Sequence, residues 1–488
     1  MTGIRLEQRF HRTRWMKRAS LGLLALALLA AVVLYASKDA RRIAELRVAE
    51  LAGNVATRVV ASKAEGAAAA DFISIPIEVR KLDEIVYQAR GVANTQVIAT
   101  SEGHVVFDTG LATQAAKQRR LLDEALPPGA ITHVVLSHSH QDHVGGTRYW
   151  TEDQTEIVTH RAFPEEQRYL LGLQDYLWSR NRMLFPFMPE DPIKSGPFAY
   201  GGIEPTQFVD DRTPLHFEQG GVRFEILSTP GAEGLDNLCL WLPDKKILLS
   251  GDTFGPNFPQ FPNVFTMRGE KVRKPIEYIY SLERLIALEP EMIIPSHQDP
   301  ITGREKIRAD LIRMRDAVRY VHDATIAGMN AGRTVHELMA SIHLPDHLAL
   351  SQIHGRVSWA VKSIWEYYAT WFHFDSTTEL YAVPVDSIRP ELARLAGIDA
   401  ITEVAARHVE AGENIEALHL LEVALAGNPN HQGALEARLS ALEDLLVRAA
   451  ASFQNSYEMD WLKYRIRITQ ESLSVAMRHS ESRVAADN

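Results

Sequence analysis

The spacing of hydrophobic residues changes several times along the chain, and these changes predict the secondary structure. Two short apolar runs, 97–100 and 105–108, flank a turn containing Gly103 and predict a β-hairpin. Helical spacing over 114–126 stops at Pro127-Pro128-Gly129, and the apolar run at 134–136 that follows predicts a buried strand. From about 309 to 467 the spacing is helical. The pattern therefore predicts strands mixed with helices first and a helical region afterwards.

Three histidines and one aspartate follow the predicted strand at 134–136 directly. They are His138, His140, Asp142 and His143, and Gly145-Gly146 comes next. We expect this cluster on a loop at the end of the strand, where a rigid scaffold commonly carries its chemistry. Two of its members can ligate one divalent metal and two a second, and zinc suits such a mixed set, with manganese or iron as alternatives. A solvated, histidine-rich surface loop is the other interpretation.

Further candidate ligands follow three other predicted strands. They are Glu233 after the strand at 222–227, Asp252 after the run at 247–250, and His297 after the run at 292–294. A carboxylate at a strand end is well placed to bridge two metals. The alternative for Glu233 is a solvated turn residue. Asp108, at the end of the hairpin, is expected to orient the histidine loop through hydrogen bonds rather than to ligate a metal.

The amino terminus has the pattern of an export signal. Lysine and arginine crowd positions 5–18, and 19–37 carries no charge over close to the roughly 20 residues that cross a bilayer. We expect a cytoplasmic basic segment at 1–18 and an uncleaved transmembrane signal anchor at 19–37. The catalytic part would then be exported, to the periplasm or surface of a bacterium. A cleaved and secreted form is the alternative, but cleavage after Ala36 would place Leu34 where a small residue is preferred.

Residues 38–84 are expected to form a stalk or linker, and a helix packed on the body is the equal alternative. Residues 159–205 are rich in aromatic side chains, proline and glycine. They form either a packed loop region or an apolar wall for a substrate tail.

Composition excludes some functions. A net charge of -10 argues against a nucleic-acid partner. The single cysteine, Cys239, lies in an apolar run, so we expect a buried core residue rather than a nucleophile or a disulfide. A length of 488 residues allows two or three domains.

The string His138 to His143 resembles the His-x-His-x-Asp-His signature of the metallo-β-lactamase superfamily. This resemblance implies an α/β fold, an αββα sandwich with a hydrolytic site for one or two metals, which we expect over 85–308. It does not fix the substrate, because one fold hosts many reactions.

Glutamate at position 233 resembles the alkylsulfatase branch, in which a Thr-Pro-Gly turn precedes a metal-binding glutamate. The segment Thr266-Met267-Arg268-Gly269 is also similar to that branch, where its arginine holds the sulfate. A guanidinium fork suits a tetrahedral oxyanion, so Arg268 is the residue expected to bind sulfate. The sequence departs from the branch at Asp236, at Asp252, which has the generic superfamily form, and at 254–257.

Residues 309–470 resemble the alkylsulfatase dimerisation domain, notably at 355–368 and 405–429, and 471–488 would form a tail. Without the resemblance, 405–429 predicts one helical hairpin of the tetratricopeptide type, which cannot bury its own face alone. A homodimer is the simplest consequence.

These observations support three hypotheses. The first is a membrane-anchored dinuclear zinc hydrolase of alkyl sulfate esters, whose substrate carries an apolar tail. His138, His140 and Glu233 would bind one metal, and Asp142, His143 and His297 the other. Asp252 would lie between the metals, and a bridging hydroxide would attack, so Asp142 and Arg268 are the predicted catalytic residues. The second hypothesis changes the substrate to another ester, a lactone or a phosphoester. The third is a non-catalytic, membrane-anchored interaction protein.

Overall fold

The computed structural model describes residues 37–64, 74–231, 233–264 and 266–486. The basic segment predicted at 1–18 and residues 19–36 of the predicted anchor lie outside this part of the chain. Within the described part, no helix is both long and apolar enough to cross a membrane.

Two β-sheets stacked face to face form the centre of the molecule. The first has seven strands in chain order, β1 Val79–Lys81, β2 Val86–Ala89, β3 Thr95–Thr100, β4 Gly103–Phe107, β5 Ile131–Val135, β6 Glu156–His160 and β7 Gln207–Val209. The second has the order β13-β12-β11-β10-β9-β8, with bounds β8 Leu215–Gln219, β9 Val222–Ser228, β10 Leu238–Leu242, β11 Ile247–Gly251, β12 Met292–Pro295 and β13 Ile301–Thr302. The hairpin predicted at 97–108 is confirmed, because β3 and β4 pair antiparallel.

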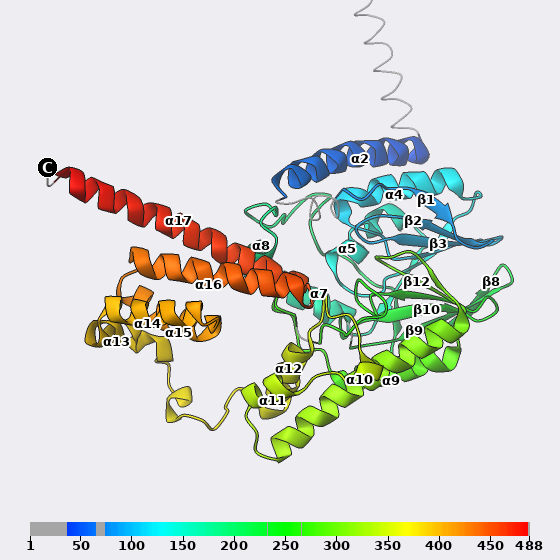
Figure 1. Cartoon of the computed structure of the whole chain (residues 1–488). Helices are drawn as coiled ribbons and strands as arrows, with labels where there is room; N and C mark the ends of the chain where they lie inside the picture. The colour runs from blue at the N-terminus through cyan, green and yellow to red at the C-terminus, as the bar shows by residue number, and fades with distance from the viewer. Residues whose placement is uncertain (1–36, 65–73, 232, 265, 487–488) are drawn as a thin grey trace, which may run out of the picture.

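Helices cover the outer face of each sheet (Figure 1). The elements involved are α2 Lys38–Lys63, α4 Ala112–Ala125, α5 Gln141–Val144 and α6 Thr147–Trp150 on one side, and α9 Pro275–Leu288 and α10 Arg304–Asn330 on the other. Strand β10 shows why the layers form. Its alternate residues Leu238, Leu240 and Leu242 enter the core between the sheets, whereas Cys239 and Trp241 enter the core under the helices. The predicted αββα sandwich and the buried Cys239 are both confirmed.

The predicted domain boundary at 308/309 falls inside α10. This helix is continuous from Arg304 to Asn330, and its residues Ile307, Leu311 and Met314 belong to the same core as α9. The sandwich and the helical region are therefore joined here by a continuous helix and not by a linker.

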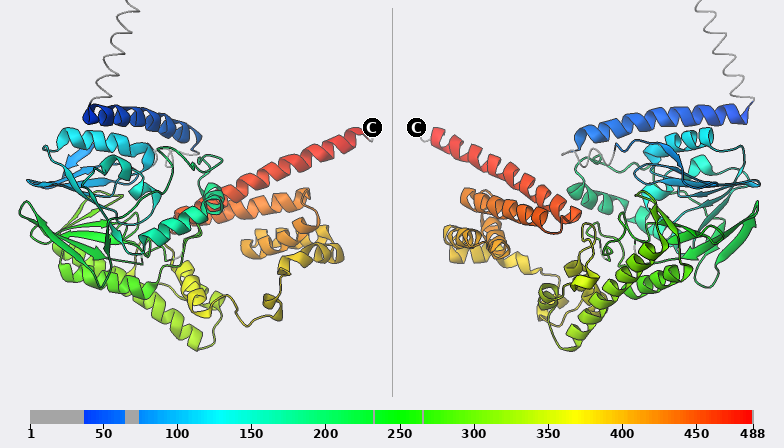
Figure 2. Two further views of the ribbon diagram at one scale, coloured as in Figure 1. Left: turned by 180° about the vertical axis from the view of Figure 1, so that it is seen from behind. Right: turned by 45° about the vertical axis from the view of Figure 1, so that its right-hand side comes forward.

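The rest of the chain is helical and projects to one side of the sandwich (Figure 2). Its helices are α11 Val335–Ser341, α12 Val357–Ala369, α13 Arg389–Ala396, α14 Ile398–Glu410, α15 Asn414–Gly427, α16 Gln432–Ala451 and α17 Ser456–Ala486, with short 3-10 turns at Asp346–Leu348, Thr377–Leu380 and Val385–Ile388. Residues 471–486 of the predicted tail continue α17. This helix returns to contact α8 Gln174–Leu184, which follows α7 Phe163–Gly172 in the aromatic insertion.

Helix α2 is packed on the body, which decides between the two alternatives for residues 38–63. Leu46 is buried, and Arg120 of α4 donates to both carboxylate oxygens of Glu50 at 2.8 and 2.9 Å. A β-carbon on Gly53 would lie 2.0 Å from the carbonyl oxygen of Thr113. Only glycine permits this approach of the two helices.

Candidate metal centre

The predicted donors converge at one edge of the sandwich. The histidine loop follows β5, Asp252 follows β11, and His297 follows β12. Because β4 pairs parallel with β5 and β11 parallel with β12, the carboxyl ends of these strands meet at the same edge. Residues 108, 138–143, 252 and 297, far apart in the sequence, thereby lie together.

Two overlapping groups of ligand atoms form there. One contains His138, His143 and Asp252, and the other Asp142, His143 and His297; within each group the ligand atoms lie within 4.8 Å of one another. His297 Nε2 is 3.0 Å from Asp252 Oδ2, and His143 Nε2 is 3.3 Å from the same oxygen. The second group is the predicted ligand set of one metal, and Asp252 contacts two of its members, His143 and His297.

In His138, His143 and His297, Nδ1 is hydrogen-bonded to the protein, and Nε2 is left available to a metal. His143 Nδ1 donates to Asp108 Oδ2 at 2.8 Å, and His297 Nδ1 donates to the carbonyl oxygen of Val92 at 2.5 Å. His138 Nδ1 donates to Ser137 Oγ at 2.9 Å. This is the arrangement that fixes the tautomer of a metal-ligating histidine, with Nε2 as the ligand atom.

Orphaned polar atoms show that the group fits a divalent cation. His138 Nε2, His143 Nε2 and Asp252 Oδ1 are buried, and none of them has a hydrogen-bond partner in the described part of the chain. Buried polar atoms without a partner are costly and call for an explanation. A metal of the zinc type accepts imidazole nitrogen and carboxylate oxygen, so it would satisfy all three.

Asp108 has the orienting role predicted for it. Its buried carboxylate accepts from Ser137 N at 2.7 Å, Ser137 Oγ at 2.8 Å and Ser296 Oγ at 3.0 Å, in addition to His143. One side chain thus ties the loop after β5 to the loop after β12.

The charges of the site polarise its titratable groups. Burial and the neighbouring imidazoles lower the pKa of His138 well below its ordinary value, which keeps this ring neutral and able to ligate. Burial also disfavours the charged form of His143, but Asp252, Asp142 and Asp108 outweigh it and raise the pKa of His143 well above its ordinary value. Carboxylates therefore concentrate negative charge here, which attracts a cation.

His140 and Glu233 lie outside both groups. His140 Nε2 donates to Glu270 Oε2 at 3.2 Å, which leaves Nδ1 as its ligand atom. Glu233 is buried, and its Oε2 lies 2.9 Å from Arg273 and 3.6 Å from Arg268. The solvated-turn alternative for Glu233 is excluded, and its role as a metal ligand stays a prediction.

Glu270 and Arg273 are site residues that the sequence did not predict. Arg273, whose side chain is 2% exposed, reaches Glu270 Oε2 at 2.7 Å, and Arg268 reaches Glu270 Oε1 at 3.1 Å. Glu270 thus connects a predicted metal ligand, His140, to the predicted sulfate-binding arginine. The only sequence signal was its place directly after the Thr-x-Arg-Gly segment.

The helical region also contributes to the site. His354 Nε2 donates to Glu233 Oε1 at 3.3 Å, and its ring lies 5.1 Å from that of Tyr457, the second residue of α17. Tyr457 in turn lies 6.4 Å from Phe185 of the aromatic insertion, and Tyr200 of that insertion donates to the carbonyl oxygen of Ser139. The insertion is therefore both packed and adjacent to the histidine loop, as each of its two interpretations requires.

Comparison with known proteins agrees with this geometry. Residues 89–297 match the family described as the metallo-beta-lactamase superfamily, and residues 334–465 match the family described as alkyl sulfatase dimerisation. A linear primary-alkylsulfatase of Pseudomonas sp. is 30% identical over 63% of this chain and 62% of its own length. The alkyl/aryl-sulfatase BDS1 of Saccharomyces cerevisiae is 23% identical over 79% of this chain and 63% of its own length.

The fold itself is found in solved structures. The stereoselective inverting sec-alkylsulfatase Pisa1 from Pseudomonas sp. superposes with a TM-score of 0.68 at 20% identity, over 83% of this chain and 66% of that one. The chain thus spans a little under two thirds of the length of these relatives.

Proposed function

The chain combines a metallo-beta-lactamase superfamily domain with an alkyl sulfatase dimerisation domain, and from this we propose that it hydrolyses alkyl sulfate esters at a divalent metal centre. The observation that carries the proposal is the set of orphaned ligand atoms on His138, His143 and Asp252, together with the buried and unpartnered Nε of Arg268. When bound, the metal supplies Lewis acidity and hydroxide at neutral pH.

We propose two metal positions, with the ligands predicted above. His143, His297 and Asp142 would hold one ion, His138, His140 and Glu233 the other, and Asp252 would lie between them. The contacts of Asp252 with His143 and His297 support the first position, and the T-shaped contact of the His138 and His140 rings supports the second. Zinc is the metal proposed for both.

Arg268 is the proposed anion-binding group. Glu270 and Glu233 hold one end of its guanidinium, at 3.1 and 3.6 Å, whereas its Nε is buried and has no hydrogen-bond partner among the described residues. These carboxylates fix the plane of the fork and leave donors for a sulfate oxygen.

Sulfate release from dodecyl sulfate by the zinc-loaded protein tests the proposal, with aryl esters and lactones assayed in parallel. Arg268→Lys keeps the charge but loses the fork, so we expect kcat/KM to fall about 10–100-fold, the value of a charge-assisted hydrogen bond. Arg168→Lys, on a surface ion pair whose arginine is 75% exposed, is the matched control.

Two results would contradict the proposal. Cleavage of carboxylic esters or lactones without sulfate release would support the alternative hydrolase. Fewer than one metal per chain after reconstitution, with no hydrolysis of any substrate, would support the interaction protein.

We also propose that the protein is a homodimer. The dimerisation-family match supports this, and so does a run of exposed apolar side chains between α12 and the end of α13. They are Trp371, Phe374, Leu380, Tyr381, Val383, Val385, Ile388, Leu392 and Leu395. Exposed apolar patches of this kind mark interaction surfaces.

Export of the catalytic part stays a proposal that rests on the sequence of residues 5–37. Protease accessibility of the folded domain in intact and in permeabilised cells would test it, and digestion only after permeabilisation of the inner membrane would contradict it.

A further inference from the structure

Helix α2 carries apolar side chains on both of its faces. Its inner face packs on α4 through Leu46 and Gly53. The outer face is left uncovered by the described chain, and α2 forms the outermost layer on this side of the sandwich (Figure 1). Five large apolar residues there are between 48% and 68% exposed, namely Ile43, Val48, Leu51, Val55 and Val59. Exposed apolar side chains gathered on one helix face mark a surface that another molecule covers.

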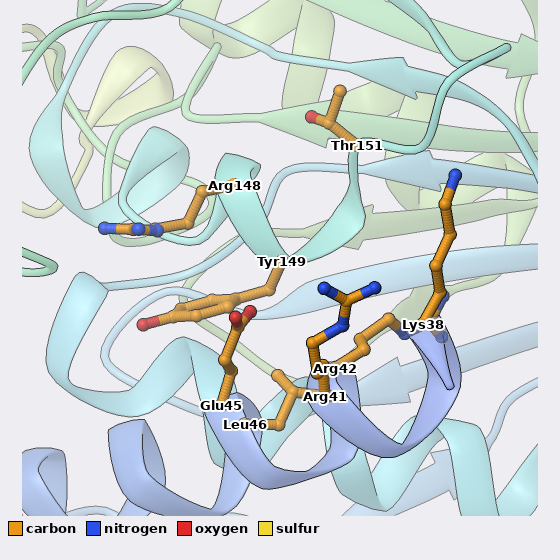
Figure 3. Close-up of a pocket in the computed structure, with 8 residues that line it drawn as sticks. All are labelled: Lys38, Arg41, Arg42, Glu45, Leu46, Arg148, Tyr149 and Thr151. Carbon is orange, nitrogen blue, oxygen red and sulfur yellow. The ribbon is translucent and has the colours of Figure 1, made fainter. Parts of the chain in front are cut away.

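The charge of α2 indicates what covers it. Residues 38–63 contain six basic and three acidic residues, in a chain whose net charge is -10. At the first turns of the helix, Lys38, Arg41 and Arg42 line a pocket of about 330 Å³ together with Arg148 of α6 and one acidic residue, Glu45 (Figure 3). A positive segment in a negative protein favours an anionic partner.

Two of these four cations are free to bind a ligand. Lys38 lies 3.4 Å from Asp153, and Arg42 lies 2.6 Å from Glu152. Neither Arg41 nor Arg148 forms an ion pair with a side chain that the structure describes.

We propose that the outer face of α2 lies on the surface of an anionic lipid bilayer, with a phospholipid head group at the pocket of Arg41 and Arg148. The helix begins at Lys38, and Ser37 caps it by accepting from Ala40 N; Ser37 is also the last residue of the uncharged stretch 19–37, which directly precedes the helix. Apolar side chains on one helix face and cations beside them are the combination by which helices adsorb to membranes.

The proposal determines the orientation of the protein relative to the membrane. Helix α2 is joined to the sandwich through the Glu50–Arg120 pair and the Gly53 contact, so a docked α2 holds the whole first sheet at one orientation. The second sheet and α9 would then face away from the bilayer (Figure 2). This inference does not depend on the reaction at the metal centre.

A fluorophore on α2 tests the proposal in the full chain reconstituted into vesicles. Leu51→Cys receives an environment-sensitive label, and the natural Cys239 is fully buried and stays unlabelled. Val447→Cys on α16, at 66% exposure beside 68% for Leu51, is the matched control. We expect the label at 51 to shift to the blue and to be quenched by lipid-attached quenchers in phosphatidylglycerol vesicles, and the label at 447 to show neither change.

The cations give a second measurement. Arg41→Gln together with Arg148→Gln should lower the docking equilibrium constant about 25-fold, since each cation at an anionic surface contributes about fivefold. Pure phosphatidylcholine vesicles should weaken docking of the parent chain at least as much, because the attraction of every cation of α2 is then lost. A label at 51 that stays water-exposed in anionic vesicles would overturn the proposal. So would a blue shift that appears in detergent without lipid and grows with protein concentration, because a second copy would then cover α2.

Discussion

Replacing Glu270 by glutamine removes its negative charge and keeps its size, at the position that connects the predicted metal ligand His140 to the predicted sulfate-binding Arg268. The Glu270 carboxylate accepts from His140 at 3.2 Å and lies 2.7 Å from Arg273 and 3.1 Å from Arg268. A glutamine of the same size is neutral and turns an NH₂ group toward one of these three donors. In either orientation of the amide, His140 loses the negatively charged acceptor that holds its Nε2 and keeps its Nδ1 free for a metal.

Metal affinity should fall at one of the two positions only. Removal of a carboxylate behind a ligating histidine typically weakens binding about 10–100-fold, which is about 1.4–2.7 kcal/mol. The position built from Asp142, His143 and His297 has its own support in Asp108 and Val92, so its affinity should not change.

The fold should also lose stability, by about 1.5–3 kcal/mol, the value of one charge-assisted hydrogen bond. In the variant, the Arg273 guanidinium still has an ion-pair partner, because Glu233 lies 2.9 Å from it. Burial opposes ionisation, but Arg268, His140 and Arg273 hold the pKa of Glu270 well below its ordinary value of 4.5. The ionised Glu270 therefore stabilises the fold at pH values above 4.5, and this stabilisation is lost as the pH falls through the lowered pKa. The free energies of unfolding of the parent and of Glu270→Gln should become equal in acid.

Titration of the chelator-treated protein with Co²⁺ would measure both affinities, because the visible spectrum of Co²⁺ also reports its coordination. Glu277→Gln, on a surface pair with Lys274, is the control for a lost carboxylate in the same segment. Two metals bound by Glu270→Gln with the parent's affinities and spectrum would refute the reasoning. If the parent itself binds no metal, the proposed function fails instead.

Three further predictions follow from other parts of the structure. Asp108→Asn should weaken metal binding about 10–100-fold in a calorimetric zinc titration, because His143 loses the negative charge of its acceptor; an unchanged affinity would contradict the orienting role. Burial raises the pKa of Asp236 from 3.8 to about 6. The buried carboxylate therefore destabilises the folded protein when it is ionised, fully above pH 6 and not at all below pH 3.8. Asp236→Asn should therefore stabilise the metal-free protein by up to about 3 kcal/mol at pH 8 and hardly at pH 4 in urea unfolding, and destabilisation at pH 8 would argue against this account. Serine at both Trp371 and Phe374 should shift the protein toward monomer in light scattering, whereas Tyr280→Ser, at 60% exposure on α9, should not; equal behaviour of the two variants would remove these residues from the interface.

The sequence determined the strands and the metal loop because both depend on local periodicity, whereas the sandwich was expected from the resemblance of residues 138–143 to the metallo-β-lactamase superfamily. Strands β4, β5, β11 and β12 are short apolar runs, and a donor placed directly after such a run must appear at the end of its strand. The orienting role of Asp108 followed in the same way, from its place at the end of β4.

Only the tertiary structure decided what surrounds these donors. Glu270 lies 130 residues from its partner His140, and His354 lies 121 residues from Glu233, so no spacing in the sequence connects them. The packing of α2 on α4 was equally undecided, because the contact depends on an absent side chain at Gly53 and on an arginine 70 residues from Glu50. Periodicity specifies which face of an element is apolar, but hydrogen bonds and ion pairs act over a few ångströms, and only the folded chain decides which distant groups come that close.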